Sequence, residues 1–134
     1  MQDRPDAPVL LNAVRVFLEE QVVPALEGTR QFHARVAANV LAIVVRELTL
    51  GEDALRAEWH RLGALLGESA AAPEGGTILA AAVRRRNEAL VERIRAGDAD
   101  EGSWRADLLA HLKATSVDRL AIANPKYAAP RGRD

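Results

Sequence analysis

The residues best placed to do chemistry lie in the most apolar stretch of the chain, residues 36–45. Asn39 interrupts this stretch, and a helix would bring Arg35, Asn39 and Arg46 to one side. Burying an amide is unfavourable unless it is hydrogen-bonded. The pattern therefore predicts a polar pocket, in which Arg35 and Arg46 hold an anion and Asn39 orients it. The alternative, which is favoured, is a structural hydrogen-bond network that ties helix ends together.

A second polar group is the run of three arginines and one asparagine at residues 84–87. Arg86 and Asn87 fall on the apolar stripe of their helix, so we expect them to point at another helix. There they would meet Asn39 or a carboxylate such as Glu47. A functional interpretation makes them contacts to phosphate or carboxylate, since arginine offers a bidentate fork. Internal salt bridging is the favoured alternative.

Other side chains give weaker signals for catalysis or metal binding. The candidate ligand-binding residues are therefore the polar side chains of the two groups described above: Arg35, Asn39, Arg46, Arg86 and Asn87. The histidines at positions 33, 60 and 111 stand alone on different helices, without the spacing of a zinc or di-iron site. The chain has no cysteine, which excludes thiol nucleophiles and cysteine-based zinc sites. We expect no metal, no cofactor and no catalytic residue. An enzyme that uses His33 or His111 as a base is the least favoured interpretation.

Composition limits the class of protein. The 134 residues are 49% hydrophobic and 28% charged, which is typical of one globular domain. A net charge of −1 argues against a nucleic-acid partner. The longest apolar stretch is far shorter than the roughly 20 residues of a membrane span. The polar N-terminus shows no secretory signal, so we expect a cytoplasmic protein with no membrane partner.

The periodicity of apolar residues predicts the elements that position these side chains. Asp6 can cap the first helix, and Gly67 and Gly97 are natural stops for the third and fourth. Thr115 or Ser116 could break the last helix in two. Trp59 and Trp104 lie on apolar stripes and are expected in the core. The predicted helices cover residues 6–22, 29–48, 52–66, 77–96 and 103–124.

The second helix is apolar on most sides, which is typical of the central helix of a domain. Its broad face carries Phe32, Val36, Val40, Ile43, Val44 and Leu48. The sequence therefore predicts an all-α, single-domain bundle of about five mostly antiparallel helices over residues 1–125, with this helix in the middle. Residues 126–134 are expected to form an extended or disordered tail.

Several segments resemble a family of small bacterial proteins of unknown function. The resemblance covers nearly the whole chain and rests on four stretches. These are residues 4–7 (Arg-Pro-Asp-Ala), the pattern Leu10-Leu11-x2-Val14-x2-Phe17-Leu18, residues 32–41 (Phe-His-Ala-Arg-Val-Ala-Ala-Asn-Val-Leu) and residues 118–127 (Asp-Arg-Leu-Ala-Ile-Ala-Asn-Pro-Lys-Tyr).

Genes of this family lie beside aminoglycoside-phosphotransferase-like kinases and acyl-CoA dehydrogenases. The resemblance implies a non-catalytic accessory subunit of such a kinase in hydroxyacyl-CoA catabolism, and it carries over no catalytic residue. The alternative function is a small-molecule binding module for an acyl-CoA or other anionic ligand. Exposed apolar positions could also pair two copies into a homodimer.

Overall fold

The first helix begins and ends where the sequence provides signals for it. In the computed structural model, which describes residues 4–128, α1 spans Ala7–Phe17. The Asp6 carboxylate caps it by accepting a hydrogen bond from the backbone N–H of Val9 at 3.2 Å, as predicted. A π-helical turn, Leu18–Val22, and a 3₁₀ turn, Val23–Ala25, continue from α1. Pro24 lies in the second turn, where the first helical segment ends.

The second element, α2, is one continuous helix of 39 residues, Gly28–Leu66. The prediction of two helices, 29–48 and 52–66, was therefore wrong. Gly51 lies in the helix interior, where a glycine costs about 1 kcal/mol but does not force a stop. The predicted end is confirmed. Gly67 adopts a φ of +71°, and the N–H of Glu68 donates to the carbonyl of Gly63 at 2.8 Å, which closes the helix with a Schellman motif.

The next two helices, α3 (Gly76–Arg95) and α4 (Ser103–Ala123), agree with the predicted boundaries to within two residues. The short α5 (Pro125–Ala128) was not predicted. The last long helix is unbroken at Thr115 and Ser116, and the Ser116 hydroxyl donates to the carbonyl of Leu112 at 2.8 Å. The start of the predicted extended tail is instead a helical turn, α5. The rest of that tail, residues 129–134, lies outside the described part of the chain.

The all-α prediction is confirmed, since residues 4–128 form helices and contain no strand. No helix in that range is both long and apolar enough to cross a membrane. The chain divides into two compact units, an N-terminal unit (Met1–Gly51) and a C-terminal unit (Glu52–Asp134). The boundary lies inside α2, so one helix contributes to both units.

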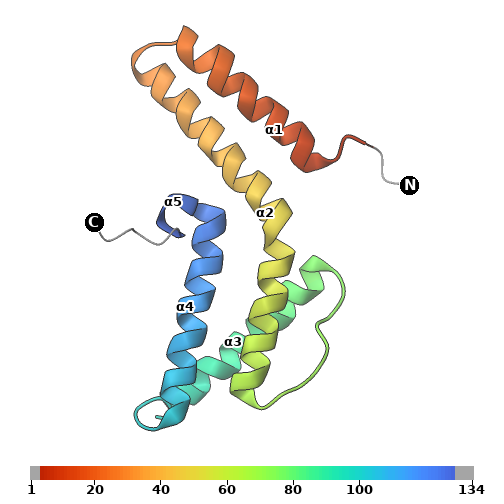
Figure 1. Cartoon of the computed structure of the whole chain (residues 1–134), viewed down its shortest axis with the longest axis vertical. Helices are drawn as coiled ribbons and strands as arrows, with labels where there is room; N and C mark the ends of the chain where they lie inside the picture. Colours follow the sequence, from red (N-terminus) through yellow and green to blue (C-terminus); the bar gives the residue numbers. More distant parts are fainter. Residues whose placement is uncertain (1–3, 129–134) are drawn as a thin grey trace. The chain divides into compact units, whose positions relative to one another are not determined.

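The N-terminal unit is a pair of helices. α1 lies beside the first part of α2 and runs in the opposite direction (Figure 1). The side-chain amide of Gln31 donates to the carbonyl of Val23 at 3.0 Å, which links the start of α2 to the connection between α1 and α2. Among the described residues of this unit, the buried hydrophobic side chains are those of Val23 and Ala38. Two helices alone bury little, and the predicted core position of the second helix is wrong for this segment.

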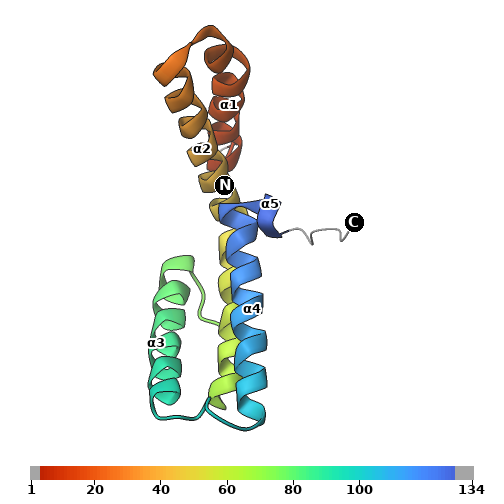
Figure 2. The ribbon, with the colours of Figure 1, turned by 90° about the vertical axis from the view of Figure 1, so that its left-hand side faces the viewer.

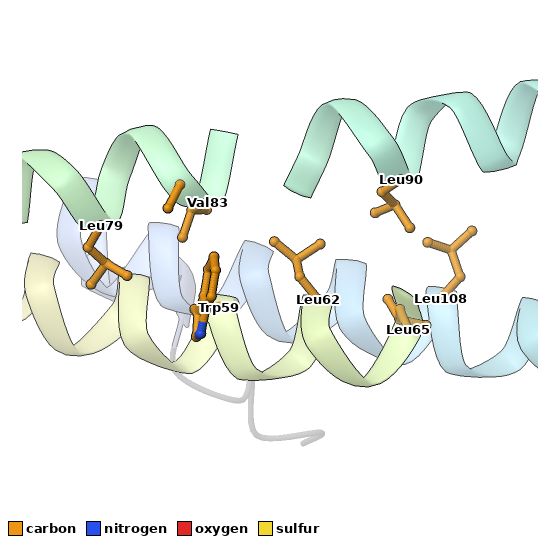
Figure 3. Close-up of a cluster of buried hydrophobic side chains, with 8 residues drawn as sticks. Trp59, Leu62, Leu65, Leu79, Val83, Leu90 and Leu108 are labelled. Carbon is orange, nitrogen blue, oxygen red and sulfur yellow. The ribbon is translucent and has the colours of Figure 1, made fainter. Parts of the chain in front are cut away.

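The C-terminal unit holds the main core. The second part of α2 packs with α3 and α4, and α4 runs antiparallel to α2 (Figure 2). α3 runs in the same direction as α2, because the loop of residues 67–75 returns along the bundle (Figure 1). The side chains of α3 interlock with those of α2 and α4 (Figure 3). The core residues are Trp59, Leu62, Leu65, Leu79, Ala82, Val83, Leu90 and Leu108, with Trp104 packed against them.

Candidate functional site

The five predicted ligand-binding residues do not lie in one unit. Arg35, Asn39 and Arg46 belong to the N-terminal unit, whereas Arg86 and Asn87 belong to the C-terminal unit. Asn39 is exposed, so the prediction that its amide is buried was wrong. The reason is angular: successive helical residues point about 100° apart. The neighbouring Ala38 is the residue buried here, at 2% exposure.

Arg86 is buried, and its guanidinium contacts a carbonyl, a carboxylate and an aromatic ring of the C-terminal unit. Its Nη1 donates to the carbonyl of Trp59 at 2.8 Å, and its Nε lies 3.0 Å from Oε2 of Glu68. The guanidinium carbon also lies 3.2 Å from the centroid of a Trp59 ring, a cation–π contact. Gly63 makes room for this arrangement, because a Cβ there would lie 2.8 Å from Nη1 of Arg86. These contacts agree with the prediction that Arg86 forms internal salt bridges and does not bind a ligand.

Asn87 also faces a carboxylate across a helix interface. Its Nδ2 donates to Oε1 of Glu58 at 2.9 Å and to the carbonyl of Val83 at 3.2 Å. Glu58 is buried, and Nη2 of Arg119 lies 3.9 Å from the same oxygen. The expectation of a carboxylate partner was correct in kind, but Glu58 and Glu68 take the place of Glu47. The hydrogen bond to Glu58 makes Asn87 part of the packing of α3 against α2.

A pocket that the sequence did not predict lies between α2 and α4 of the C-terminal unit. It is open to solvent and has a volume of about 310 Å³. Its lining comes from Arg61, Ala64 and Leu65 of α2 and from Trp104, Asp107, Ala110 and His111 of α4. The spacing of Trp104, Asp107 and His111 (i, i+3, i+7) marks one helix face. However, no local pattern shows that this face meets α2, and for that reason the pocket could not be found from sequence.

Two groups fix the walls of this pocket. The indole Nε1 of Trp104 and Nη1 of Arg93 both donate to the carbonyl of Leu65, at 3.0 and 2.7 Å. The guanidinium carbon of Arg93 lies 4.3 Å from the centroid of a Trp104 ring. The second group is Arg61, whose Nη2 donates to Oδ2 of Asp118 at 2.8 Å. The arginine charges are therefore placed by the protein itself before any ligand binds.

His111 is the unusual polar residue of the pocket lining. It is 4% exposed, and its Nδ1 has no hydrogen-bond partner in the described part of the chain. Burial lowers the pKa of His111 below its ordinary value of 6.5, and the positive charge of Arg61 lowers it further, against the opposing effect of Glu58. The imidazole is therefore neutral at pH 7.

The N-terminal unit presents apolar side chains to solvent instead of a pocket. Five of the six side chains of the predicted broad face of α2 are 38–62% exposed, and the sixth, Ile43, is half-buried. The exposed five recur at every fourth residue and form the α2 stripe: Phe32, Val36, Val40, Val44 and Leu48. A second exposed set lies on α1, with Leu10, Val14 and Phe17 at 49–56% exposure. Surface patches of this kind usually mark an interaction site. Arg35 and Asn39 are also exposed on this segment of α2.

The histidines and acidic residues make no metal centre among residues 4–128, where no group of three or more such side chains could hold an ion. His33 and His60 are exposed, and His33 contacts Phe32 with ring centroids 5.8 Å apart. Among residues 4–128, His33 makes no hydrogen bond or ion pair with a carboxylate or a nucleophile.

Comparison with known proteins gives one match. A family model described as "Domain of unknown function (DUF6285)" matches residues 24–127. The matched segment begins at Pro24, after α1, and ends within α5. No curated protein and no solved structure matches the chain.

Proposed function

The chain belongs to the DUF6285 family of domains of unknown function, and on that premise we propose that it is a non-catalytic accessory subunit. It binds a phosphotransferase-like kinase of bacterial hydroxyacyl-CoA catabolism, and it does so through the α2 stripe. The kinase phosphorylates the substrate hydroxyl before dehydration, and this chain assists it.

The observation that supports the proposal is the exposure of the α2 stripe. Its five side chains would form the core of an ordinary helical bundle, yet they remain 38–62% exposed. An apolar helix face is normally buried against another element. Covering the exposed part of each side chain contributes about 1–2 kcal/mol. The exposed Arg35 and Asn39 on the same helix segment supply the polar rim that surrounds most interface cores.

The choice of partner follows from the family resemblance of the sequence. Genes of the resembling family lie beside aminoglycoside-phosphotransferase-like kinases and acyl-CoA dehydrogenases. A helical protein with an unpartnered apolar face, and with no metal cluster among residues 4–128, suits a binding role better than a catalytic one. The kinase is the neighbour whose activity an accessory subunit can modulate.

The test is co-purification of the two proteins and an assay of the kinase with and without this chain. The variant Val36→Glu/Val40→Glu should weaken the complex at least tenfold, because it places two charges in the α2 stripe. The matched control is Leu109→Glu/Leu112→Glu, which changes two similarly exposed leucines of α4 (56% and 45%) in the other unit. That control should bind the kinase as the wild type does.

Three results would contradict the proposal. One is the absence of both a complex and a change in kinase activity. Another is equal binding by the stripe variant and the control. The third is a homodimer, measured by light scattering, that the stripe variant converts to monomers, since a second copy would then occupy the α2 stripe.

The alternative function, binding of an acyl-CoA or other anionic ligand at the five predicted polar residues, has less support. Arg86 and Asn87 already contact the internal carboxylates of Glu68 and Glu58. Arg35 and Asn39 are exposed in the other unit. An anion site made from all five would need two of them to leave these partners.

A further inference from the structure

We propose that the pocket between α2 and α4 binds a small primary amine with an apolar body, whose ammonium group pairs with Asp107. This binding site is separate from the α2 stripe, because it lies in the C-terminal unit. The inference depends on the shape of the pocket and on which of its polar groups lack partners.

The size and the walls of the pocket suit a small apolar body. Its volume of about 310 Å³ lies at the lower end of the range for ligand sites, roughly 300–1,000 Å³. Its apolar lining consists of Ala64 and Leu65 from α2 and Trp104 and Ala110 from α4. The hydrogen bond from Trp104 Nε1 to the carbonyl of Leu65 holds the indole in place, so this wall exists before a ligand enters.

The polar groups of the lining select a cation. Asp107 is exposed and makes no hydrogen bond or ion pair with any described residue, so its carboxylate is free to accept. The cation of the lining is already neutralised, because Arg61 pairs with Asp118 at 2.8 Å. A ligand carboxylate would therefore meet the unpaired negative charge of Asp107 and an arginine whose Nη2 already pairs with a carboxylate and whose Nε is buried. An ammonium group meets the unpaired charge of Asp107 as its partner.

His111, one turn beyond Asp107 on α4, contributes an uncharged imidazole to the lining. Its ring is neutral, and its buried Nδ1 lacks a partner in the described chain. An uncharged ring gives a ligand carboxylate no positive charge to pair with. The apolar walls then provide most of the affinity, and the charge of Asp107 provides the preference for amines over acids.

The test uses three probes with the same tail and different head groups: hexylamine, hexanol and hexanoate. Each is titrated into the full chain and followed by ¹⁵N NMR. Hexylamine should shift the indole N–H signal of Trp104 and the backbone signal of His111, with millimolar affinity. The indole of Trp59 is the internal reference, because it donates to the carbonyl of Ala70 away from the pocket. Hexanoate should bind at least fivefold more weakly than hexylamine.

Two variants separate the charge from the cavity. Asp107→Asn should weaken hexylamine at least fivefold and leave hexanol unchanged, while Asp53→Asn, an equal change of charge at another exposed aspartate, should have no effect. Ala110→Trp should abolish binding of all three probes by filling the space. Hexanoate binding as tightly as hexylamine would overturn the proposal. The same holds if Asp107→Asn leaves hexylamine affinity unchanged, or if no probe moves the Trp104 signal.

Discussion

Buried polar side chains of the C-terminal unit differ in how completely the protein satisfies them. Arg86 has a carbonyl, a carboxylate and an aromatic ring around one guanidinium. His111 is as deeply buried but has an unpartnered Nδ1. Since a buried donor or acceptor without a partner is destabilising by about 1–3 kcal/mol, the first residue should contribute to stability and the second should make stability depend on pH.

We expect Arg86→Ala to destabilise the protein by about 2–3 kcal/mol, because it removes a buried hydrogen bond and the packing on Trp59. The matched control is Arg84→Ala, an exposed arginine of the same run, which should change stability by less than about 0.5 kcal/mol. Urea unfolding followed by circular dichroism measures both values. Equal losses in the two variants would show that the contacts of Arg86 carry little stability.

His111 should make the wild-type protein less stable in mild acid. Its pKa in the folded state lies below 6.5, mainly because of burial, so the unfolded chain binds more protons below that value. The stability it contributes is complete above pH 6.5 and is lost as the pH falls toward the folded-state pKa. His111→Gln removes this titration. The free energy of unfolding, measured from pH 8 to pH 5, should therefore fall more steeply in the wild type, and parallel curves would contradict the assignment.

At the scale of elements, the sequence predicted helix ends better than helix continuity. Asp6, Gly67 and Gly97 mark ends because a cap or a positive φ leaves a local signature. Gly51 left no such signature, and α2 runs through it. Whether a glycine ends a helix depends on the residues that pack around it, which the local sequence does not contain.

Two glycines of α2 should therefore respond in opposite ways to alanine. A Cβ at Gly51 would meet Oε1 of the exposed Glu47 at 2.8 Å, a side-chain end that can rotate away. At Gly63 it would meet the backbone carbonyl oxygen of Glu68 at 2.6 Å, as well as Arg86. We expect Gly51→Ala to stabilise by about 0.5–1 kcal/mol and Gly63→Ala to destabilise by about 1–3 kcal/mol. Thermal unfolding measures both, and a shift of the same sign in the two variants would contradict this reading of their surroundings.

At the scale of the whole molecule, apolar spacing predicted the faces of helices but not what covers them. The stripe with Trp59 and Leu62 is core, whereas the α2 stripe is exposed although its spacing is equally regular. A helix face looks the same in sequence whether it meets the rest of its own chain or a partner. The same limit explains the error at Asn39, whose expected burial depended on the surrounding stripe being core.

The two units should also differ in how readily they open, even within one continuous helix. The backbone N–H of Val40 lies in the N-terminal unit, where Val23 and Ala38 are the buried hydrophobic side chains of the described residues. The N–H of Leu62 lies in the C-terminal unit, inside the main core. Opening free energies follow the density of buried apolar contacts. Native-state hydrogen exchange of the full chain should therefore be at least about tenfold faster at Val40 than at Leu62. Addition of the kinase should slow exchange at Val40 more than at Leu62, because the proposed partner covers the α2 stripe. Equal protection at the two amides of the free chain would show that the N-terminal helix pair is stable without any partner, and the exposure of its stripe would then no longer favour a binding role.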